Sequence, residues 1–389
     1  MSDLINSFMA FIKPEPAPPP GMYHYIAPQE NPLNYRLHLR VEPDGRGLLI
    51  VNAATILHLN ETATEYAYHM VHGLGEDQVI QKITRRYRIT PDEARLDYRH
   101  LVNRLQSLVE TTDLDPVTIL EFERQEPFSG DISAPYRLDC AITYRQPEGI
   151  PAELAPIARV TRELSTDEWK TILDKAWLAG IPHVIFTGGE PTLRPDLPEL
   201  LAHAEKIEQV SGLLTTGLAF SEPAYLDQLL QTGLDHILFL LLPENPGSWQ
   251  ALENVLAADI YVAVHLTLGA ALGGSLGASA NDLLDRLAGM GVKAVSLSAA
   301  TPDDFPAQEL ARSHAAAIGL DLVWNLPVPY SALNPVAQET DQKEHTAAEG
   351  RAWMYLEPDG DVLPAQGATQ VLGNALTGSL KDLWTSTRA

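Results

Sequence analysis

The sequence predicts an α/β protein in which a small winged helix-turn-helix unit precedes a larger domain of repeated strand–helix units. Strand-like and helical stretches alternate from residue 137 to residue 326. This alternation is typical of a parallel sheet, either open or curved into a barrel. Before this region, about 75 residues contain short stretches in which apolar and polar residues alternate, followed by three amphipathic helices. This is the pattern of a winged helix-turn-helix.

Composition describes a globular protein with a full core. The 389 residues carry a formal net charge of -24, with 45% hydrophobic and 20% charged residues. This length allows two or three domains. The acidity argues against a protein that coats nucleic acid or an anionic membrane. No apolar stretch of about 18 residues and no signal-peptide pattern are present, so we expect a cytoplasmic protein without a membrane partner.

Cys140 is the single cysteine of the chain. One cysteine excludes an internal disulfide framework, and by itself it cannot build a cysteine zinc site or hold an iron–sulfur cluster. Cys140 lies within a predicted strand, where a lone cysteine is most often a small core residue. We therefore expect no metal site built on it.

Residues 1–30 are predicted to form an apolar helix and a Pro-rich tether. The helix is amphipathic after Ser2, and the prolines from Pro14 to Pro20 end it. Such a helix could dock on a partner or pack on its own domain. Both alternatives stay open.

Residues 31–110 are predicted to form the first domain, a small antiparallel sheet followed by three helices. The stretches Tyr35–Val41 and Leu48–Val51 flank Pro43-Asp44-Gly45, which is a hairpin signature. The third helix has Thr90 as its cap, and Glu93 completes a capping box. Helices are expected at Thr62–Val71, at Glu76–Arg88 and from Pro91 onward, the last with the apolar face Ala94, Tyr98, Leu101, Leu105 and Leu108.

Basic residues gather on the second and third of these helices. Set against Asp92, Glu93 and Asp97, the basic residues are Lys82, Arg85, Arg86, Arg88, Arg95, Arg99 and Arg104. The excess could be a solvated face, or it could meet an acidic peptide or DNA phosphates. Nucleic acid is the least favoured of the three because the chain as a whole is acidic.

Residues 111–134 are polar and are predicted to be a linker to the larger domain, residues 135–335. Strands are expected there at Arg137–Tyr144, His183–Thr187, Gly212–Thr216, His236–Leu241, Tyr261–Leu268, Ala294–Ser298 and Leu320–Leu326. Helices are expected at Thr166–Leu178, Leu197–Val210, Ala224–Thr232, Ser248–Ala258 and Asn281–Met290. No Gly-x-Gly-x-x-Gly follows the first strand, which disfavours dinucleotide binding.

The stretch from His183 to Leu193 is the leading candidate for a ligand site. An apolar strand runs into Gly188-Gly189-Glu190-Pro191, which places backbone groups and one carboxylate at the carboxyl end of the strand. Ligands of parallel α/β folds usually bind at that end. From these residues alone, an ordinary strand-to-helix loop is an equal alternative.

The first domain resembles the PqqD-like family of peptide-binding winged-helix modules, also called RiPP recognition elements. The resemblance rests on Leu59-Asn60-Glu61-Thr62-Ala63, on Gly73, and on the two helices that follow, through Val79 to Tyr87 and Asp92 to Asp97. It implies that a leader peptide adds as an extra strand to the small sheet and rests against the third helix. The peptide-binding residues implied are Leu48, Leu49, Ile50, Val51, Arg95 and Arg99.

The region from Pro135 to Trp384 resembles the radical SAM superfamily, in particular the branch with a C-terminal SPASM extension that acts on peptides. The matching segments are Arg137–Arg145, Phe186–Leu197, Thr215-Thr216-Gly217, Glu357–Pro364 and Leu372–Trp384. The resemblance implies a partial (β/α)6 TIM-like barrel. It also implies a degenerate SPASM-like extension over residues 336–389 and the architecture of a fused peptide-modifying enzyme.

In that family a Gly-Gly-Glu-Pro loop lies along the amino end of S-adenosylmethionine (SAM). The glycines allow close approach of the backbone, and the carboxylate complements the ammonium. Thr215-Thr216-Gly217 departs at its centre from the Thr-Asn-Gly usual in the family. The resemblance thus implies a SAM or small-ligand site at Gly188, Gly189, Glu190, Pro191, Thr215 and Thr216.

The iron–sulfur cluster of the family has no cysteine ligands in this chain. The family spacing C-x3-C-x2-C, counted from the residue after Arg145, falls on Gln146, Ile150 and Glu153. Ala365 occupies the position of a cluster cysteine in the extension. Such clusters are held by thiolates. We therefore expect no iron–sulfur cluster, no catalytic residue of the radical SAM type and no bound cofactor, with SAM binding left open.

Three functions compete. The first is a non-catalytic, radical-SAM-like pseudoenzyme that binds a ribosomally made precursor peptide and assists or regulates an active radical SAM or other maturation enzyme. The second is a cluster-independent enzyme that retains SAM or another small ligand, for methyl transfer to a peptide for example. Its candidate polar groups are Glu190, Asp139, His236, His265 and Thr267. The third is a DNA-binding regulator that uses the winged helix.

A polar connection from Asn325 to Arg351 is predicted to be a solvated loop. It contains Glu344, His345 and Glu349, whose spacing is not the helical pair of zinc proteases. No metal site is expected there.

Overall fold

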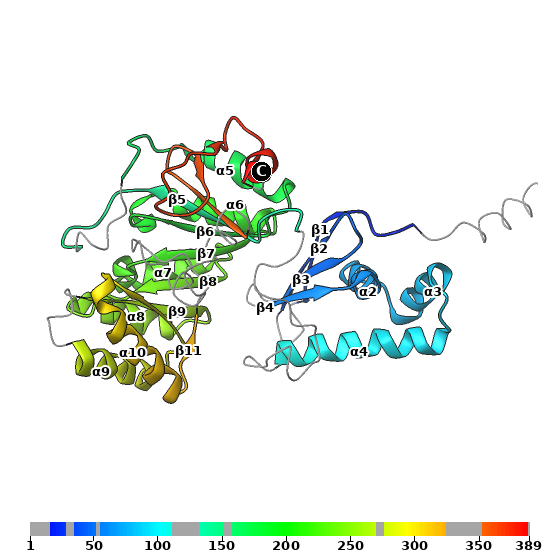
Figure 1. Ribbon diagram of the computed structural model, residues 1–389, viewed down its shortest axis with the longest axis horizontal. Helices are drawn as coiled ribbons and strands as arrows, with labels where there is room; N and C mark the ends of the chain where they lie inside the picture. Colours follow the sequence, from blue (N-terminus) through cyan, green and yellow to red (C-terminus); the bar gives the residue numbers. More distant parts are fainter. Residues whose placement is uncertain are drawn as a thin grey trace, which may run out of the picture. The chain divides into compact units, whose positions relative to one another are not determined.

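The computed structural model describes residues 16–28, 35–51, 55–110, 132–150, 158–269, 276–323 and 352–387. The chain divides into two compact units, Met1–Ser133 and Ala134–Ala389, drawn in blue to cyan and in green to red in Figure 1. The predicted N-terminal helix, most of the predicted linker, and the connection from Asn325 to Arg351 lie outside the described residues.

The first unit contains a four-stranded antiparallel sheet in the order β1-β2-β3-β4. Its strands are β1 (Gly21–Ile26), β2 (Arg36–Val41), β3 (Gly47–Val51) and β4 (Thr55–Leu59). Strands β2 and β3 form the predicted hairpin, with Leu39 opposite Leu49. Strand β1 lies in the predicted tether and was not expected. Its residues are half-buried or exposed throughout, so its sequence lacks the alternation that marks a strand.

Three helices follow the sheet: α2 (Glu61–Val71), α3 (Glu76–Arg86) and α4 (Pro91–Glu110). The five apolar residues predicted to face inward on α4 are all buried. They join one core with residues of the sheet and of the other helices, among them Leu39, Leu49, Leu57, Tyr66 and Ile83. The predicted capping box forms, since Glu93 N donates to Thr90 Oγ1 and Thr90 N donates to Glu93 Oε2.

The second unit is built on a ten-stranded sheet in the order β11-β10-β9-β8-β7-β6-β5-β12-β13-β14. Neighbouring strands from β5 to β11 pair in parallel. These strands are β5 (Arg137–Thr143), β6 (His183–Gly188), β7 (Val210–Thr215), β8 (His236–Leu240), β9 (Tyr261–Leu268), β10 (Ala294–Ala299) and β11 (Asp321–Leu322). The predicted parallel α/β sheet is confirmed, and the carboxyl ends of its strands meet at one edge.

Helices connect these strands, as Figure 1 shows. They are α5 (Thr166–Leu178), α6 (Leu197–Lys206), α7 (Pro223–Leu230), α8 (Pro246–Leu256), α9 (Leu276–Gly289) and α10 (Phe305–Ala317), with short 3-10 turns η2 (Pro191–Leu193), η3 (Leu218–Ser221) and η5 (Pro302–Asp304). Helix α10 was not predicted. It buries Gln308, Ala311 and Ala315, and such small or polar residues leave a weak apolar periodicity.

The C-terminal residues extend the same sheet. They form β12 (Trp353–Leu356), β13 (Asp361–Leu363), β14 (Gly373–Asn374) and α12 (Leu380–Ser386). Strand β12 pairs in parallel with β5, so β5 has a partner on each side and all of its residues are buried. Among the described residues, no helix combines the length and the apolar character needed to cross a membrane.

Removal of the α4 cap should destabilise the first unit. In Thr90→Ala, the side chain that accepts from Glu93 N is lost, and we expect the free energy of unfolding to fall by about 1 kcal/mol. Urea denaturation measures this change. Asn103→Ala, at an exposed position of the same helix, is the control and should not destabilise. Equal stability of Thr90→Ala and the native chain would contradict the cap.

Candidate functional site

The loop after β6 packs tightly against the chain that follows β5. Gly189 N donates to Thr143 O at 2.6 Å, and Glu190 N donates to Arg145 O at 2.8 Å. A Cβ added at Gly188 would lie 2.1 Å from Thr143 O, and one at Gly189 would lie 2.0 Å from Arg145 O. Both glycines are therefore required because the chain approaches its own backbone here.

Glu190 is the centre of a dense hydrogen-bond cluster, and it is 1% exposed. Its Oε1 accepts from Thr192 N at 3.1 Å, Thr192 Oγ1 at 2.6 Å and Thr215 Oγ1 at 2.6 Å. Its Oε2 accepts from Thr216 N at 2.8 Å and Thr216 Oγ1 at 2.6 Å. The structure thus brings together Glu190, Thr215 and Thr216, three residues that the sequence assigned to one site.

Two hydroxyl groups in this region have no hydrogen-bond partner among the described residues, Thr187 Oγ1 and Tyr225 Oη. Thr187 is 1% exposed and lies next to Gly188 in β6. Burial and the nearby Glu190 charge raise the pKa of Tyr225 to about 12. Buried hydroxyls normally find a partner in protein or ordered water, so these two groups could meet a small polar ligand. The sequence analysis did not single out either residue.

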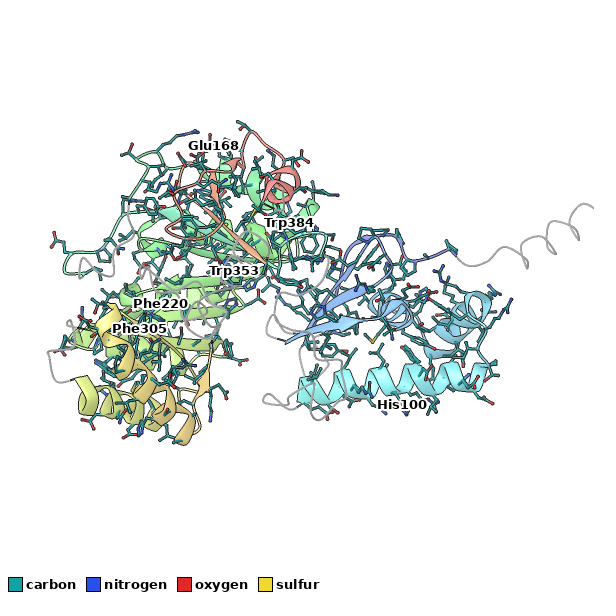
Figure 2. The ribbon with its side chains drawn as sticks, in the orientation of Figure 1. His100, Glu168, Phe220, Phe305, Trp353 and Trp384 are labelled. Atoms are coloured by element: carbon teal, nitrogen blue, oxygen red, sulfur yellow. The ribbon has the colours of Figure 1, made fainter. Side chains whose placement is uncertain are left out.

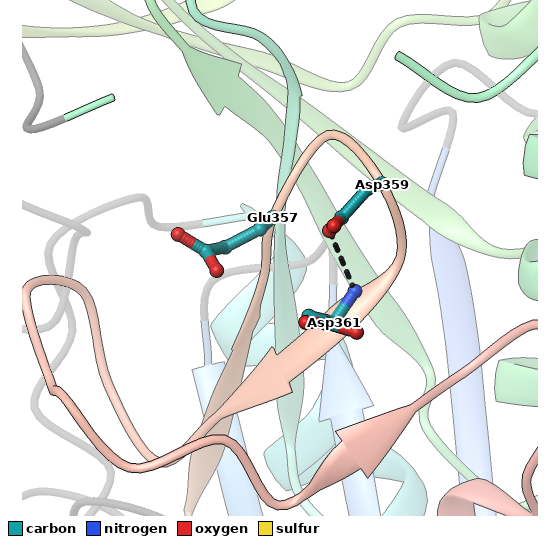
Figure 3. A group of neighbouring side chains, drawn as sticks. All are labelled: Glu357, Asp359 and Asp361. Atoms are coloured by element: carbon teal, nitrogen blue, oxygen red, sulfur yellow. Dashed lines mark hydrogen bonds between the residues drawn. The ribbon is translucent and has the colours of Figure 1, made fainter. Parts of the chain in front are cut away.

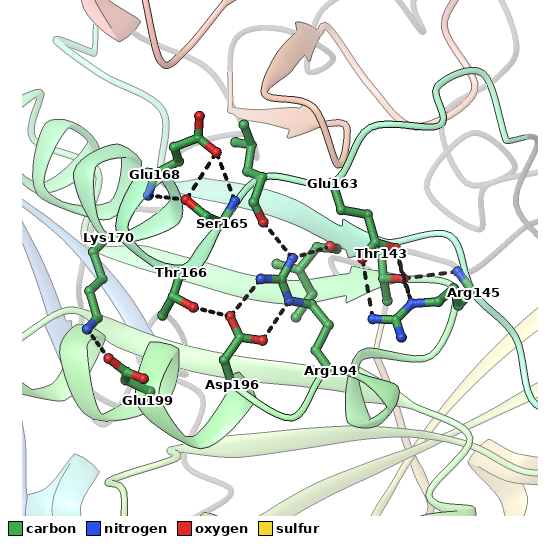
Figure 4. Close-up of polar contacts among 12 residues, drawn as sticks. Thr143, Arg145, Glu163, Ser165, Thr166, Glu168, Lys170, Arg194, Asp196 and Glu199 are labelled. Atoms are coloured by element: carbon green, nitrogen blue, oxygen red, sulfur yellow. Dashed lines mark hydrogen bonds and ion pairs between the residues drawn. The ribbon is translucent and has the colours of Figure 1, made fainter.

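A second polar cluster, centred on Arg194 and Asp196, holds the same loop, as Figure 4 shows. Arg194 Nη1 donates to the carbonyl oxygens of Ile142 and Leu164, both at 3.0 Å. The same guanidinium forms a bidentate pair with Asp196, at 2.9 and 2.7 Å. Thr166 Oγ1 also donates to Asp196, at 2.6 Å. The arrangement joins β5, the start of α5 and the loop after β6.

The residues at the implied cluster positions do not fit an iron–sulfur cluster. Gln146 offers an amide whose two polar atoms are buried and have no hydrogen-bond partner in the part of the chain that the structure describes. Ile150 is half-buried, and Glu153 lies outside the described residues. Ala365 is buried. None of these side chains carries a thiolate, the ligand that such clusters use.

Cys140 cannot replace the missing ligands. It is fully buried in β5, which lies between β6 and β12 in the sheet. Burial, together with the charge of Asp139, raises the pKa of the Cys140 thiol well above its ordinary value. The thiol is therefore neutral and enclosed, as expected for a core residue.

The other polar candidates do not form a catalytic group. His236 is the first residue of β8, so it lies at the amino end of the strand, where burial and the Arg137 charge lower its pKa to about 4. Asp139 pairs with Arg137 at 2.6 Å. The prediction that His236 lies at a ligand-binding strand end is therefore wrong, because ligands of parallel sheets bind at the opposite edge. Asp139 lies within β5, where its carboxylate is engaged by Arg137.

His265 is a structural residue of the core. It is fully buried and contacts the hydroxyls of Ser296 at 3.0 Å, Ser298 at 3.1 Å and Thr267 at 3.2 Å. Burial lowers the pKa of His265 to about 3. A neutral imidazole with partners on both ring nitrogens is satisfied, so the cluster has no group free to act on a substrate.

One group of acidic residues among those described could hold a cation, namely Glu357, Asp359 and Asp361, whose ligand atoms lie within 4.8 Å of one another. Figure 3 shows them around the turn between β12 and β13. Their contacts are those of a hairpin: Asp361 N donates to Asp359 Oδ1, and Asn374 Nδ2 donates to Asp361 Oδ1. Glu357 accepts from Tyr144 Oη at 3.1 Å. Glu357 Oε1 also lies 3.7 Å from Arg159 Nε, whereas the buried Oε2 has no hydrogen-bond partner among the described residues.

In the first unit, the strand predicted to bind a peptide is an internal strand of the sheet. Residues Leu48–Val51 lie in β3, which pairs along its length with β2 on one side and β4 on the other. Its backbone therefore cannot accept an added strand. Arg95 and Arg99 are also engaged, because both form ion pairs with Glu76 and Arg95 forms a further one with Asp77.

A groove lies instead between β4 and α4. A cavity of about 370 Å³ is lined there by His58, Leu59, Asn60, Thr62, Ala63, Tyr66, Asp97, His100, Leu101 and Arg104. Figure 2 labels His100 on α4. Within the described residues β4 pairs only with β3, and its last two residues, His58 and Leu59, line the cavity. A candidate site for an extended peptide is therefore β4 and α4, in place of β3 and the predicted arginines.

Comparisons with known proteins relate the second unit to the radical SAM superfamily, whose family model matches residues 140–241. A PqqA peptide cyclase of Xanthomonas oryzae is 40% identical over 108 residues, covering 27% of this chain and 29% of the relative. The chain thus matches less than a third of the length of that relative. A PqqA peptide cyclase of Streptomyces rochei is 27% identical over 293 residues, covering 66% of this chain and 78% of the relative.

Among solved structures, Streptococcus suis SuiB bound to the precursor peptide SuiA has a TM-score of 0.56 at 14% identity, covering 93% of this chain and 88% of that chain. SuiB bound to S-adenosylmethionine has a TM-score of 0.55 at 15% identity, with coverage of 92% and 88%. At this level of identity the similarity shows a shared fold.

The ion pair and hydrogen bonds that Asp196 forms with Arg194 and Thr166 should make the stability of the second unit sensitive to acid. Burial alone would raise the pKa of Asp196, but hydrogen bonds from Arg194 and Thr166 hold it at about 2, below the ordinary 3.8. Because the pKa is depressed in the folded state, the stabilisation is present above pH 3.8 and is lost as the pH falls toward 2.

Asp196→Asn cannot ionise, so its melting temperature should fall less than that of the native protein between pH 4 and pH 2, although it is lower at neutral pH. Thermal unfolding across this range is the measurement. The control is Asp227→Asn, at an exposed position of α7. If the melting temperatures of Asp196→Asn and of the native chain fell equally between pH 4 and pH 2, ionisation of Asp196 would not be the cause of the acid sensitivity.

Proposed function

We propose that this chain is a non-catalytic, radical-SAM-like protein that binds a ribosomally made precursor peptide and assists or regulates a separate peptide-modifying enzyme. In this proposal residues 31–110 act as a PqqD-like winged-helix module. Residues 135–335 act as a partial barrel, and residues 336–389 act as a degenerate SPASM-like extension. The observation that carries the proposal is a strand edge and a cavity at the same place in the first unit.

The edge of β4 offers main-chain hydrogen bonds to an incoming strand. A β-strand with one unpaired side presents a row of N–H and C=O groups, and peptide-recognition modules use such edges for strand addition. Because β4 pairs only with β3 among the described residues, a peptide added there would extend the sheet as a fifth strand beside α4.

Side chains of the groove then define what the peptide must carry. Leu59, Tyr66 and Leu101 give it an apolar floor, and all three are buried. His58, His100 and Arg104 supply basic or titratable groups along its length, against one carboxylate, Asp97. An extended segment with an apolar anchor and neighbouring polar side chains matches this lining.

The non-catalytic part of the proposal rests on the missing thiolates. Reductive cleavage of SAM requires a cluster held by cysteines, and the chain has one cysteine, which is enclosed in β5. A scaffold of this kind can still bind a peptide and present it to a partner. The PqqA peptide cyclases and SuiB supply the precedent of a peptide substrate or ligand on a related sequence or fold.

A cluster-independent enzyme is the second candidate. It is favoured by the two buried hydroxyls without partners, Thr187 Oγ1 and Tyr225 Oη, which could contact a small ligand at the carboxyl ends of the strands. Transfer of a methyl group from SAM to a bound peptide, detected by mass spectrometry, would establish it. A DNA-binding role is disfavoured because Arg95 and Arg99 already pair with acidic residues of α3.

Filling the groove should weaken peptide binding. Thr62 is half-buried and lines the cavity, so Thr62→Trp places a large side chain across it. We expect the affinity for a precursor peptide to fall at least about tenfold, or about 1.4 kcal/mol. Fluorescence anisotropy with labelled PqqA peptide and with short peptides encoded beside the gene measures the affinity.

Gln106→Trp is the matched control, because Gln106 is an exposed residue of α4 that does not line the cavity. It should bind as the native protein does. Equal loss in both variants, or no effect of Thr62→Trp on a peptide that binds, would place the peptide elsewhere. Failure of every such peptide to bind the native protein would remove the peptide-binding proposal.

Anaerobic reconstitution with iron and sulfide should leave the protein without a cluster. With no set of thiolates available, the protein should remain colourless and hold only trace iron after desalting. Iron and sulfide analysis of the full chain provides the measurement, with Cys140→Ala as the control for incidental binding to the single thiol. One four-iron cluster per chain would contradict the non-catalytic assignment.

A further inference from the structure

We infer that Glu190 is a positioning residue that ties the end of β6 to the end of β7, and that its carboxylate does not bind the ammonium of a cofactor. The resemblance to radical SAM proteins implies the opposite role for this residue. The inference goes beyond the proposed function, which concerns the peptide groove of the first unit.

The acceptor capacity of Glu190 is already used. A carboxylate offers about four lone-pair directions, whereas five donors from the chain itself lie within 3.1 Å of its oxygens. The residue is 1% exposed. An incoming ammonium would have to displace donors that already neutralise the buried charge, and the displaced groups would then need new partners.

The donors come from the two segments that a ligand would have to separate. Thr192 belongs to the turn directly after Glu190, whereas Thr215 and Thr216 end β7, 25 and 26 residues further along. Thr215 Oγ1 also accepts from Gly217 N at 2.9 Å, which fixes the orientation of this hydroxyl. Thr215 and Thr216 are each no more than 2% exposed. The second threonine stands where the family usually has asparagine.

Gly188 and Gly189, which precede Glu190, leave no space for a ligand beside their Cα atoms. Space beside Gly188 and Gly189 is filled by the carbonyl oxygens of Thr143 and Arg145, which a Cβ would meet at 2.1 and 2.0 Å. A glycine kept for ligand approach would face open space. Here both glycines face the backbone of the same chain, so the loop is closed around Glu190 from two directions.

The two carboxylate oxygens provide a sharp test. Oε1 accepts from the backbone N–H of Thr192, and Oε2 accepts from the backbone N–H of Thr216. In Glu190→Gln, either orientation of the amide turns an NH2 group toward one of these N–H groups. Hydroxyls can rotate to adapt, but a backbone N–H cannot, so one buried donor is left without an acceptor.

We expect Glu190→Gln to raise the equilibrium constant for unfolding roughly ten- to a hundredfold. Thr216→Val removes one hydroxyl donor and keeps the backbone N–H, so it should raise this constant by a smaller factor and stays measurable if the glutamine variant does not fold. Glu199→Gln is the matched control, because Glu199 is an exposed residue of α6 that pairs with Lys170. Urea unfolding of the full chain gives all three values.

Calorimetry with SAM completes the test on the same proteins. Two results together support the inference. The Glu190→Gln and Thr216→Val variants are less stable than the native chain, and the native protein either binds no SAM or binds it with an affinity that both folded variants retain. Native stability of both variants would overturn it. So would SAM binding that is lost in a folded Glu190→Gln. Peptide binding measured in parallel tests the proposed function separately.

Discussion

A buried carboxylate that must be neutralised by fixed donors organises the carboxyl edge of the second unit. A charge removed from water costs several kcal/mol unless it is fully hydrogen-bonded. Glu190 meets this constraint with donors from its own turn and from the end of β7. Arg194 meets the complementary constraint with Asp196 and with two backbone carbonyl oxygens from β5 and the loop before α5. Together the two clusters join four segments: β5, the start of α5 with the loop before it, the loop after β6 and the end of β7.

This edge therefore differs in character from an open ligand site. The chain after β5 is bound at Thr143 and Arg145 by the N–H groups of Gly189 and Glu190, and β5 itself is enclosed between β6 and β12. The one thiol of the chain lies inside that strand, where it contributes volume to the core. Gly188, Gly189 and Glu190 of the stretch that resembles a cofactor loop are thus explained by packing and charge neutralisation, whereas the buried Thr187 Oγ1 has no hydrogen-bond partner among the described residues.

Local patterns were enough to predict most elements. Buried β-branched strands such as Tyr261–Leu268 and the capped helix at Pro91 were found because their signals lie within a few neighbouring residues. Strand β1 and helix α10 were missed because burial in them is partial or falls on small and polar residues. Glu190 was found as a strand-end acid, but its partners depend on the pairing of β6 with β7, which no local pattern contains.

The proposed peptide site shows the same limit of prediction from sequence. Sequence alternation identified Leu48–Val51 as a strand, but whether a strand is an edge depends on the order of the sheet, and here β3 is internal. An internal strand has no free backbone groups to offer. An edge strand has them, and a protein must cover, shorten or use such an edge. Strand β4 is short, and its residues His58 and Leu59 line a cavity together with residues of α2 and α4. In the proposed complex, an added peptide strand would pair with β4 and pack beside this cavity, whose apolar residues Leu59, Tyr66 and Leu101 are already buried in the native chain.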